Sequence, residues 1–594
     1  MMNIPMHRFT YTKLTKEEIG EKLKSTEEGP KCVSEFSDIL AGKSFKIVTK
    51  DGPVLDYTFE SKNKLTLSEN GGSKTKAGYG ALTLKQMVFF SHMIPKIQKG
   101  YNVFVDLDTN LVTVFEVWLS SGKTEKTLRG KEFMVDDREV QRQIYFGYIE
   151  VEGQEPPKEL HHLTNRIEGK GIHWKQDTGI ETLELYASVV STNFVELTRY
   201  MDDLSYCSPS DYVLVNDNMF IYDRTECEFS GIFTLFVADL FSEKQAGVRL
   251  GFNERDELEY YIFRGNGRVV GQLANLESFD DHGKEPIVVQ AASDPQSPGK
   301  GQRLVYRPVR DFIYMTDEEV HQAALKSTKA FGGGRDAASP MAGNNMPFTD
   351  MLMGKEFILR YDRGGPVRHY KITDKYKLQY MAEGENIWHE ESYRAYEADE
   401  RLVFFSHILT DSKPRASVQV ALDLLNGLTT CIHSQMGTKY FGNETSYYAI
   451  FGVAEMDGLE PPRYTRHEFT DELVGHAFAW NYNDQLGAMH LYTTPHSAAW
   501  TIFTETQALG AQWCSPSIFV KIREGVYIYA ANEEACNGNE LVFMINKKIS
   551  HDCGFSFNGG EGGVNLNVVG AVGRHLGQFN IKEFFGPKIR MKGA

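Results

Sequence analysis

The chain is poor in the features that mark secreted, membrane-spanning and disulfide-stabilised proteins. It has 7 cysteines in 594 residues and no CxxC pair, which is typical of free thiols in a reducing cytosol. No run of about 18 apolar residues occurs, as a membrane-spanning helix requires. The first residues lack the apolar segment of a secretory signal. We therefore expect a cytoplasmic location and no membrane partner.

An excess of positive charge is also missing. Lys and Arg number 64 against 80 Asp and Glu, for a formal net charge of −16. Too few cations remain to neutralise phosphates, so we expect no nucleic-acid partner. Nucleotide-binding loops, HExxH, GxSxG and EF-hand motifs are absent, and the histidines lack metal-ligand spacing. We expect no cofactor and no bound metal.

What the chain does contain is a long internal repeat. "VFFSHMIP" (88–95) returns as "VFFSHILT" (403–410), "VEGQEPP" (151–157) as "MDGLEPP" (456–462), and "CSPS" occurs at 207–210 and 514–517. The offset between paired motifs drifts only from about 301 to 315. A register kept over so many motifs indicates two tandem copies of a unit of roughly 290 residues.

Within each copy the local pattern predicts β-structure. Apolar and polar residues alternate over 101–119 and 417–432, with Asp-Thr-Asn and Asn-Gly at the bends, and hairpins are also predicted at 212–223 and 518–531. Short strands at this spacing favour antiparallel barrels or sandwiches. Capping boxes at Thr15/Glu18 and Thr316/Glu319 predict a short helix leading into each copy.

Each copy divides at its "EPP", because Pro-Pro ends both helices and central strands. The predicted organisation therefore has six parts. They are a leader helix (1–35), two β-domains of copy 1 (36–157 and 165–280), a linker with the second leader helix (281–346), and two β-domains of copy 2 (347–462 and 470–582).

Large aromatic residues recur at matched positions of the two C-terminal domains. The copy 1 members are Trp174, Tyr186, Phe194, Tyr206, Phe220 and Tyr222; their copy 2 partners are Trp480, Tyr492, Trp500, Trp513, Tyr527 and Tyr529. Glu226 and Glu533 stand four residues after the last pair. Alternate strand residues share one face, so phenols and a carboxylate can line one barrel interior and exchange a proton with a bound molecule.

The same residues also fit core packing, since duplication preserves packing as well as sites. His92 and His407 close apolar strands, and each fits a hydrogen-bonded structural histidine or an acid–base group. His490 and His496 stand where copy 1 has Glu184 and Val190. These extra titratable groups locate the predicted working cavity in the C-terminal domain of copy 2.

Two longer stretches resemble a known family. Residues 475–534, "GHAFAWNYNDQLGAMHLYTTPHSAAW" through "VYIYAANEE", resemble the C-terminal domain of the molybdenum cofactor biosynthesis protein F (MoaF) family. Residues 344–357 and 392–405 resemble its N-terminal domain, and copy 1 resembles both more weakly. The resemblance implies two lipocalin-like (calycin) β-barrels per unit, and hence four here. Calycin-like barrels also include cofactor-free decarboxylases similar to phenolic acid decarboxylase, whose sites use tyrosines and a glutamate.

Two functions follow from these patterns. The first is a cofactor-independent lyase, isomerase or cyclase acting on a small aromatic or carbonyl-containing metabolite. Its expected catalytic residues are Tyr529, Glu533, Tyr492 and His407, and its expected substrate-binding residues are Trp480, Trp513, His490, Trp500, Tyr527, Tyr186, Tyr222 and Glu226. The second is a lipocalin-like protein that binds a small hydrophobic molecule. An accessory role in molybdenum cofactor synthesis is a third possibility.

Overall fold

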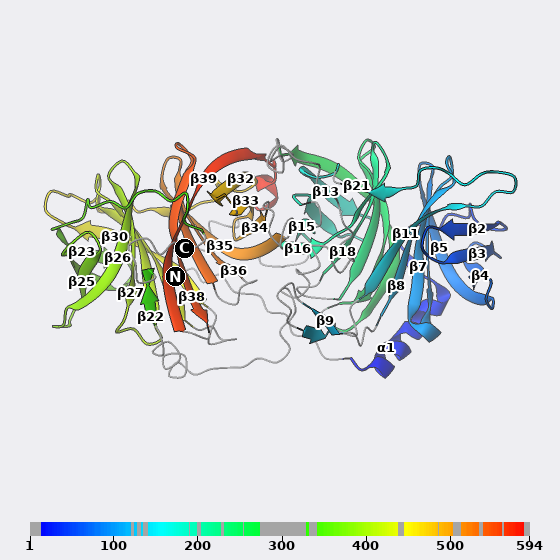
Figure 1. The fold of residues 1–594 in the computed structure, drawn as a ribbon, viewed down its shortest axis with the longest axis horizontal. Helices are drawn as coiled ribbons and strands as arrows, with labels where there is room; N and C mark the ends of the chain where they lie inside the picture. The colour runs from blue at the N-terminus through cyan, green and yellow to red at the C-terminus, as the bar shows by residue number, and fades with distance from the viewer. Residues whose placement is uncertain are drawn as a thin grey trace.

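The computed structural model describes residues 14–586, apart from gaps at 120–123, 127–131, 135–139, 165, 189–190, 199–203, 227–230, 254, 274–327, 332–340, 437–444, 485, 503–511, 534–538 and 561–562. The fold is mainly β, as predicted. The β-structure gathers into an elongated row, with the two N-terminal barrels at its ends and the two C-terminal sheets in the middle (Figure 1). Within the described part of the chain, no helix has the length and apolar character needed to cross a membrane.

The N-terminal barrel of each copy is a closed ring of eight antiparallel strands that follow one another around the ring. In copy 1 they are β2 (Ser44–Thr49), β3 (Val54–Phe59), β4 (Lys64–Glu69), β5 (Thr75–Leu84), β6 (Met87–Ile94), β7 (Lys99–Asp106), β8 (Leu111–Trp118) and β11 (Gln141–Ile149). In copy 2 they are β23 (Glu356–Tyr361), β24 (Val367–Ile372), β25 (Lys377–Ala382), β26 (His389–Asp399), β27 (Leu402–Leu409), β28 (Ala416–Asp423), β29 (Leu428–Met436) and β30 (Thr445–Glu455).

The C-terminal barrel of copy 2 is the third closed barrel, because its last strand pairs with both its first and its seventh. Its strands are β32 (His476–Asn483), β33 (Leu486–Thr494), β34 (Ser497–Ile502), β35 (Gln512–Arg523), β36 (Val526–Glu533), β37 (Asn539–Asn546), β38 (His551–Gly560) and β39 (Gly563–Gln578). The strands β22 (Thr328–Ala330) and β31 (Glu468–Phe469) add to β39 and β35.

The matching sheet of copy 1 curls in the same way but its ladder is interrupted. Its strands are β13 (Lys170–Gln176), β14 (Glu181–Leu185), β15 (Ser191–Glu196), β16 (Tyr206–Pro209), β17 (Tyr212–Asn216), β18 (Met219–Thr225), β19 (Phe233–Asp239), β20 (Lys244–Phe252) and β21 (Leu258–Gln272), with β1 (Lys31–Cys32) and β12 (His162–Leu163) at the edges. The break lies between β16 and β17, where Asp211 donates its N–H to the Asp223 side chain at 2.7 Å. In copy 2 the corresponding β35 runs through without a break.

The local sequence signals form as predicted. Asn110, Gly427 and Gly525 occupy the left-handed region (φ 59°, 74° and 72°) at the predicted hairpin turns. Thr15 and Glu18 form the capping box at the start of α1 (Lys16–Leu23). The second predicted box, Thr316/Glu319, lies outside the described residues. The strand pairs within the barrels are antiparallel; parallel pairs are described only where β1 and β22 join their sheets.

The remaining described elements are small. They are the ribbon of β9 (Thr124–Lys126) and β10 (Glu132–Met134) and the 3-10 helices η1 (Lys24–Glu28), η2 (Pro95–Ile97) and η6 (Lys582–Phe584).

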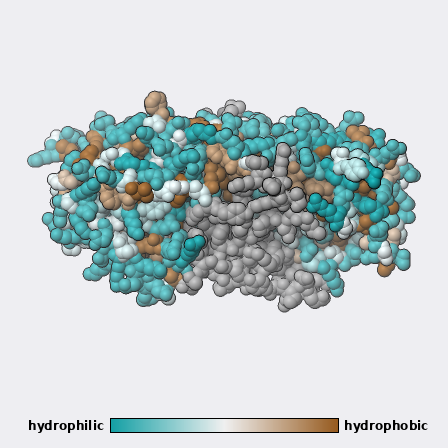
Figure 2. Space-filling view, turned by 180° about the vertical axis from the view of Figure 1, so that it is seen from behind, coloured by the Kyte–Doolittle hydropathy of each residue, from teal (hydrophilic) through white to brown (hydrophobic). Residues whose placement is uncertain are grey.

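Apolar residues fill the barrel interiors and the contacts between neighbouring barrels. One cluster joins the two barrels of copy 1, another joins those of copy 2, and a third joins the two C-terminal sheets across the middle of the molecule. The face in Figure 2 is mainly hydrophilic over both ends, with apolar residues scattered among polar ones. The inward faces of the strands therefore hold most of the large aromatic side chains.

Candidate functional site: the interior of the second C-terminal barrel

The interior of the copy 2 C-terminal barrel is lined with aromatic rings. The Tyr529 ring on β36 is stacked between Phe519 and Phe543, with centroids 5.5 and 5.9 Å away. Tyr492 on β33 meets Tyr529 edge to face at 5.3 Å, and His490 lies 5.7 Å from the same ring. The strand register brings these side chains to one inward face, so the sequence correctly placed Tyr492, Tyr529 and His490 together.

Trp480 completes this wall from β32. Its ring lies 5.5 Å from Phe478 and 6.4 Å from His490, and its six-membered ring rests against Gly573 on β39. A Cβ at residue 573 would come within 2.3 Å of the ring. Copy 1 repeats the arrangement with Trp174 on Gly267. The glycine at this position therefore provides the space in which each tryptophan sits.

Several polar atoms of this interior have no hydrogen-bond partner among the described residues. Trp513 Nε1 and Ser515 Oγ are two of them, on β35. Four more belong to residues around the aromatic wall: Trp480 Nε1, His490 Nδ1, the Tyr492 hydroxyl and Asp552 Oδ2. All four residues are buried, and none of them is more than 5% exposed. An unpartnered buried polar group costs roughly 1–3 kcal/mol. Four such groups at one barrel interior therefore indicate a place for a hydrogen-bonding ligand.

Burial disfavours the charged form of each of these titratable groups. It lowers the pKa of His490 to about 3 and raises the pKa of Asp552 well above its ordinary value. It also raises the pKa of Tyr492; the nearby Tyr529 and Asp552 add to that rise, and the neighbouring Trp480 N–H opposes it. Asp552 Oδ1 accepts the Ala571 N–H at 2.7 Å, which leaves Oδ2 as the carboxyl oxygen without a partner. The interior therefore offers N–H and O–H donors from Trp480 and Tyr492, and a carboxyl group at Asp552 whose neutral form burial favours.

In the equivalent interior of copy 1 the matching tyrosines and tryptophan are hydrogen-bonded, although Arg224 Nε, Thr234 Oγ1 and the side-chain amide of Gln245 have no partner among the described residues. Glu184, at the position of His490, accepts a hydrogen bond from Tyr222 at 2.6 Å and another from Tyr186 at 3.2 Å. Trp174 Nε1 donates to the Tyr186 hydroxyl at 3.2 Å. Arg224 binds the second oxygen of Glu184 at 2.8 Å. Polar groups that are already paired leave few for a ligand.

Glu226 extends this network rather than facing an open space. Arg249 binds its two oxygens, with the Nη2–Oε2 distance at 3.0 Å and a shorter contact from Nη1 to Oε1. Arg224 approaches the same carboxylate at 3.7 Å. In copy 2, Ala531 stands at the matching position of β36, two residues after Tyr529, so the cation of Arg224 has no counterpart there. Tyr186, Tyr222 and Glu226 are therefore parts of a paired structural network.

Of the other predicted residues, the two tryptophans adjoin the aromatic wall, and Trp513 Nε1 also has no hydrogen-bond partner in the described part of the chain. Trp500 and Trp513 stack on each other at 4.5 Å and are half-buried; Trp500 lies opposite His490 in the ladder. The Tyr527 ring is buried, but its hydroxyl donates to Glu472 at 2.7 Å. Glu533 ends β36, and its side chain lies outside the described residues. The Tyr527 hydroxyl is therefore not hydrogen-bonded to any of the four unpartnered atoms around the aromatic wall.

His407 lies in a different barrel from Tyr492 and Tyr529. In the N-terminal barrel of copy 2, its Nε2 is 3.1 Å from the Tyr370 hydroxyl and its Nδ1 is 2.9 Å from the Ile408 carbonyl. Burial lowers its pKa to about 3. His92 of copy 1 has the same tyrosine contact, with Tyr57 at 3.0 Å. The geometry matches the structural interpretation of this histidine rather than the acid–base one.

The sequence interpretation missed Asp552 and Tyr482. Asp552, Gly554 and Ser556 are every second residue of β38, so they lie on the same inward face. The Tyr482 hydroxyl lies 3.2 Å from His490 Nε2, within hydrogen-bonding distance. A single acidic residue within the apolar stretch "HDCGFSF" was the available signal. Strand alternation could have assigned it to the interior once the position of β38 in the ring was known.

Among the described residues, one group has ligand atoms close enough together for a metal ion. Glu385, His389 and Asp411 have such atoms within 4.8 Å of one another at the surface of the copy 2 N-terminal barrel. His389 already lies 3.8 Å from both carboxylates, and the Tyr380 hydroxyl donates to Asp411. Ordinary ion pairing accounts for this cluster.

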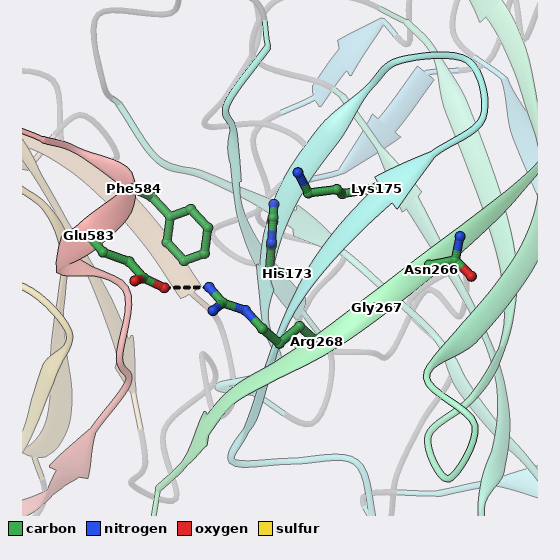
Figure 3. Close-up of a pocket in the computed structure, with 7 residues that line it drawn as sticks. All are labelled: His173, Lys175, Asn266, Gly267, Arg268, Glu583 and Phe584. Carbon is green, nitrogen blue, oxygen red and sulfur yellow. Dashed lines mark hydrogen bonds and ion pairs between the residues drawn. The ribbon is translucent and has the colours of Figure 1, made fainter.

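A hollow of about 550 Å³ lies on the surface where the two copies meet (Figure 3). Arg268 and Glu583 form an ion pair across it, and the Arg268 guanidinium lies 5.2 Å from the centroid of the Phe584 ring. His173 contacts the same ring at 4.5 Å and bonds Glu181 at 3.1 Å. These paired side chains hold η6 against β13 and β21, so the hollow belongs to the contact between copies.

The fold and this interior define a protein of antiparallel eight-stranded barrels with an aromatic, partly polar lumen. The family model described as the MoaF N-terminal domain matches residues 335–438. The match covers β23 to β29, most of the N-terminal barrel of copy 2, and confirms the resemblance predicted there. A search of curated proteins finds no match to the chain.

Proposed function

We propose that the C-terminal barrel of copy 2 binds a small aromatic or apolar molecule that carries a carbonyl oxygen. The observation that carries the proposal is the convergence of unpartnered donors at Trp480, Tyr492 and Asp552 on an aromatic wall. A carbonyl oxygen accepts two such hydrogen bonds, and the rings of Tyr529 and Trp480 provide apolar contact for its body. Sites of this kind are mostly apolar, with a few convergent polar groups.

One further observation supports this location. In copy 1 the matching tyrosines bond Glu184, which Arg224 also binds, whereas in copy 2 the Tyr492 hydroxyl has no such partner among the described residues. The family match lies in the neighbouring N-terminal barrel, and the proposal does not rest on it. The five described cysteines are free, which supports a cytoplasmic location for this binding function.

A cofactor-independent proton transfer, as in a lyase, isomerase or cyclase, is the second candidate. It is favoured by Asp552, whose carboxyl lies near Tyr492 and whose pKa burial raises well above its ordinary value. A neutral carboxyl can donate its proton to a carbonyl oxygen as an enol forms, while a separate base removes the proton from the α-carbon; His490, with a pKa lowered to about 3, is too weak for that role. Glu533, at the end of β36, remains a proposed alternative acid or base.

The binding proposal is tested with acetophenone, a neutral aromatic ketone, and ethylbenzene, which has a similar shape but no oxygen. In calorimetric titrations we expect acetophenone to bind more tightly than ethylbenzene. Tyr492→Phe should weaken acetophenone binding roughly three- to tenfold, since one hydrogen bond is lost. The matched Tyr186→Phe in copy 1 should leave it unchanged. Equal binding of the two probes, or no effect of Tyr492→Phe, would overturn the proposal.

The catalytic candidate is tested with the same ketone in deuterated buffer. Proton NMR would follow exchange of the acetophenone methyl protons, which requires reversible enol formation. We expect exchange above the buffer rate, reduced by about a hundredfold or more in Asp552→Asn. This variant keeps an oxygen for the Ala571 N–H. Binding without any exchange would leave the binding function and reject proton transfer for this ligand.

A further inference from the structure

The N-terminal barrel of copy 2 contains a buried arginine that has no partner among the described residues. Arg368 lies on β24 between Val367 and His369, and it shares the inward face with Tyr370. The residue is 8% exposed, and its Nη1 has no hydrogen-bond partner. No hydrogen bond or ion pair of Arg368 occurs among the residues that the structure describes.

The groups around this guanidinium do not neutralise it. Its strongest electrostatic neighbours are Tyr370, Cys431, Tyr361 and Tyr448. Burial raises the pKa of the Cys431 thiol to about 11 and raises the pKa of each of these tyrosines, so all four are uncharged at pH 7. A buried charge with no counter-ion is strongly destabilising, typically more so than a buried pair.

The carboxylates of the same barrel have other partners. Glu391 accepts a hydrogen bond from the Thr410 hydroxyl, and Asp411 accepts one from Tyr380. Asp423 binds Arg523 of the neighbouring barrel at 2.7 and 2.8 Å. The described carboxylates that could pair with a cation are thus held away from Arg368.

Two further polar atoms of this interior are without partners. They are His433 Nδ1 and the Tyr361 hydroxyl, which lies near Thr429 and Cys431 but forms no hydrogen bond of normal geometry with them. His433 stacks on Tyr448 with centroids 4.9 Å apart, and Arg368 contributes to the lowering of the His433 pKa to about 4. A guanidinium, a phenol and an imidazole therefore share one interior with unused hydrogen-bonding capacity.

Copy 1 shows that the barrel does not need this arginine. Leu55, on β3, stands at the matching position, two residues before Tyr57 as Arg368 stands two before Tyr370, and it is fully buried. The copy 1 interior instead pairs Lys99 with Glu116 at 2.7 Å and with Glu69 at 3.2 Å. A leucine satisfies the fold, so the unpartnered cation is a feature of copy 2 alone.

We propose that Arg368 binds the carboxylate of a small organic acid inside the N-terminal barrel of copy 2. The guanidinium fork matches the two oxygens of a carboxylate. One cation balances one negative charge, which favours a monocarboxylate over a phosphate dianion. The body of the acid would lie against the rings of Tyr370 and Phe405, whose centroids are 5.8 Å apart. This site differs from the proposed ketone site in its barrel and in the charge of its ligand.

The test compares sodium benzoate with the neutral benzamide and with inorganic phosphate by calorimetry. We expect benzoate to bind more tightly than either. Arg368→Met should weaken benzoate binding by about tenfold to a hundredfold, as expected for a charge-assisted hydrogen bond. Arg360→Met, at an exposed ion pair on the neighbouring strand, should have no effect. Tyr492→Phe should also have none, which separates this site from the ketone site.

A stability measurement keeps the proposal testable if a variant folds poorly. Because the ligand-free cation is unpaired, Arg368→Met should raise the melting temperature of the ligand-free protein while it abolishes the further rise caused by benzoate. Tighter binding of phosphate than of benzoate would reject the monocarboxylate. Equal binding of benzoate and benzamide, equal benzoate binding by Arg368→Met, or no binding of benzoate at millimolar concentration would overturn the proposal.

Discussion

Tyr222 donates a hydrogen bond of 2.6 Å to Glu184, and the pair is fully buried inside the C-terminal sheet of copy 1. In copy 2 the tyrosine is kept as Tyr529, but His490 replaces the carboxylate. This one exchange alters the whole interior, because Glu184 also binds Tyr186 and Arg224. In copy 1 the tyrosines are therefore tied to a buried carboxylate, whereas the matching Tyr492 hydroxyl of copy 2 has no hydrogen-bond partner within the described part of the chain.

The network around Glu184 predicts a large stability cost when its cation is removed. Arg224→Met leaves Glu184 buried without a counter-ion, and we expect a loss of about 3–5 kcal/mol in the free energy of unfolding. The control is Arg166→Met, which breaks an exposed ion pair with Asp217 and should cost less than about 1 kcal/mol. Urea denaturation measures both. A similar small cost for the two variants would show that the network is not stabilising.

The barrels were predictable from the sequence because their signals are local. Hairpin turns at Asn110, Gly427 and Gly525 and alternation along the strands need only neighbouring residues. Because the motifs repeat, the same signals also predicted the barrels of the second copy. The interruption between β16 and β17 was not predictable, because it depends on Asp211 bonding Asp223 across a ladder.

The candidate site was predictable only in its aromatic half. Tyr492, Tyr529 and Trp480 were found because they recur in both copies. Asp552 and Arg368 were missed because each occurs in one copy and acts across the barrel, where ring closure sets the neighbours. His407 was grouped with Tyr529 by chemistry alone, and the fold separates them into two barrels. Repetition thus reveals what the copies share, whereas the proposed sites depend on what they do not share.

Glu540 predicts an alkaline loss of stability. It is fully buried between the two barrels of copy 2, where Ser434 donates to it at 2.7 Å, and burial raises its pKa from 4.5 to about 8. The folded chain therefore holds this proton more tightly than the unfolded chain. The contribution of Glu540 to the free energy of unfolding should fall as the pH rises from about 4.5 to about 8, by up to about 1.4 kcal/mol per pH unit.

Glu540→Gln should remove this component and leave a flatter profile above pH 5. Glu524→Gln, at an exposed residue, should keep the wild-type slope. Chemical denaturation between pH 5 and 9 measures the difference. The same slope in wild type and Glu540→Gln would contradict the assignment of a raised pKa to this carboxyl.

His407 predicts a loss of stability in acid. Burial lowers its pKa from 6.5 to about 3, and the neutral ring is held by the Ile408 carbonyl at Nδ1 and the Tyr370 hydroxyl at Nε2. The unfolded chain binds the proton more readily than the folded chain, so this contribution to stability is complete above about pH 6.5 and declines as the pH falls towards 3.

His407→Gln has no proton to gain and should therefore show a shallower decline between pH 6.5 and 4. His369→Gln, on the outward face of β24, should decline as steeply as wild type. Acetophenone binding at neutral pH should persist in His407→Gln, because this histidine and the ketone site lie in separate barrels; its loss in a folded variant would instead assign His407 to the site.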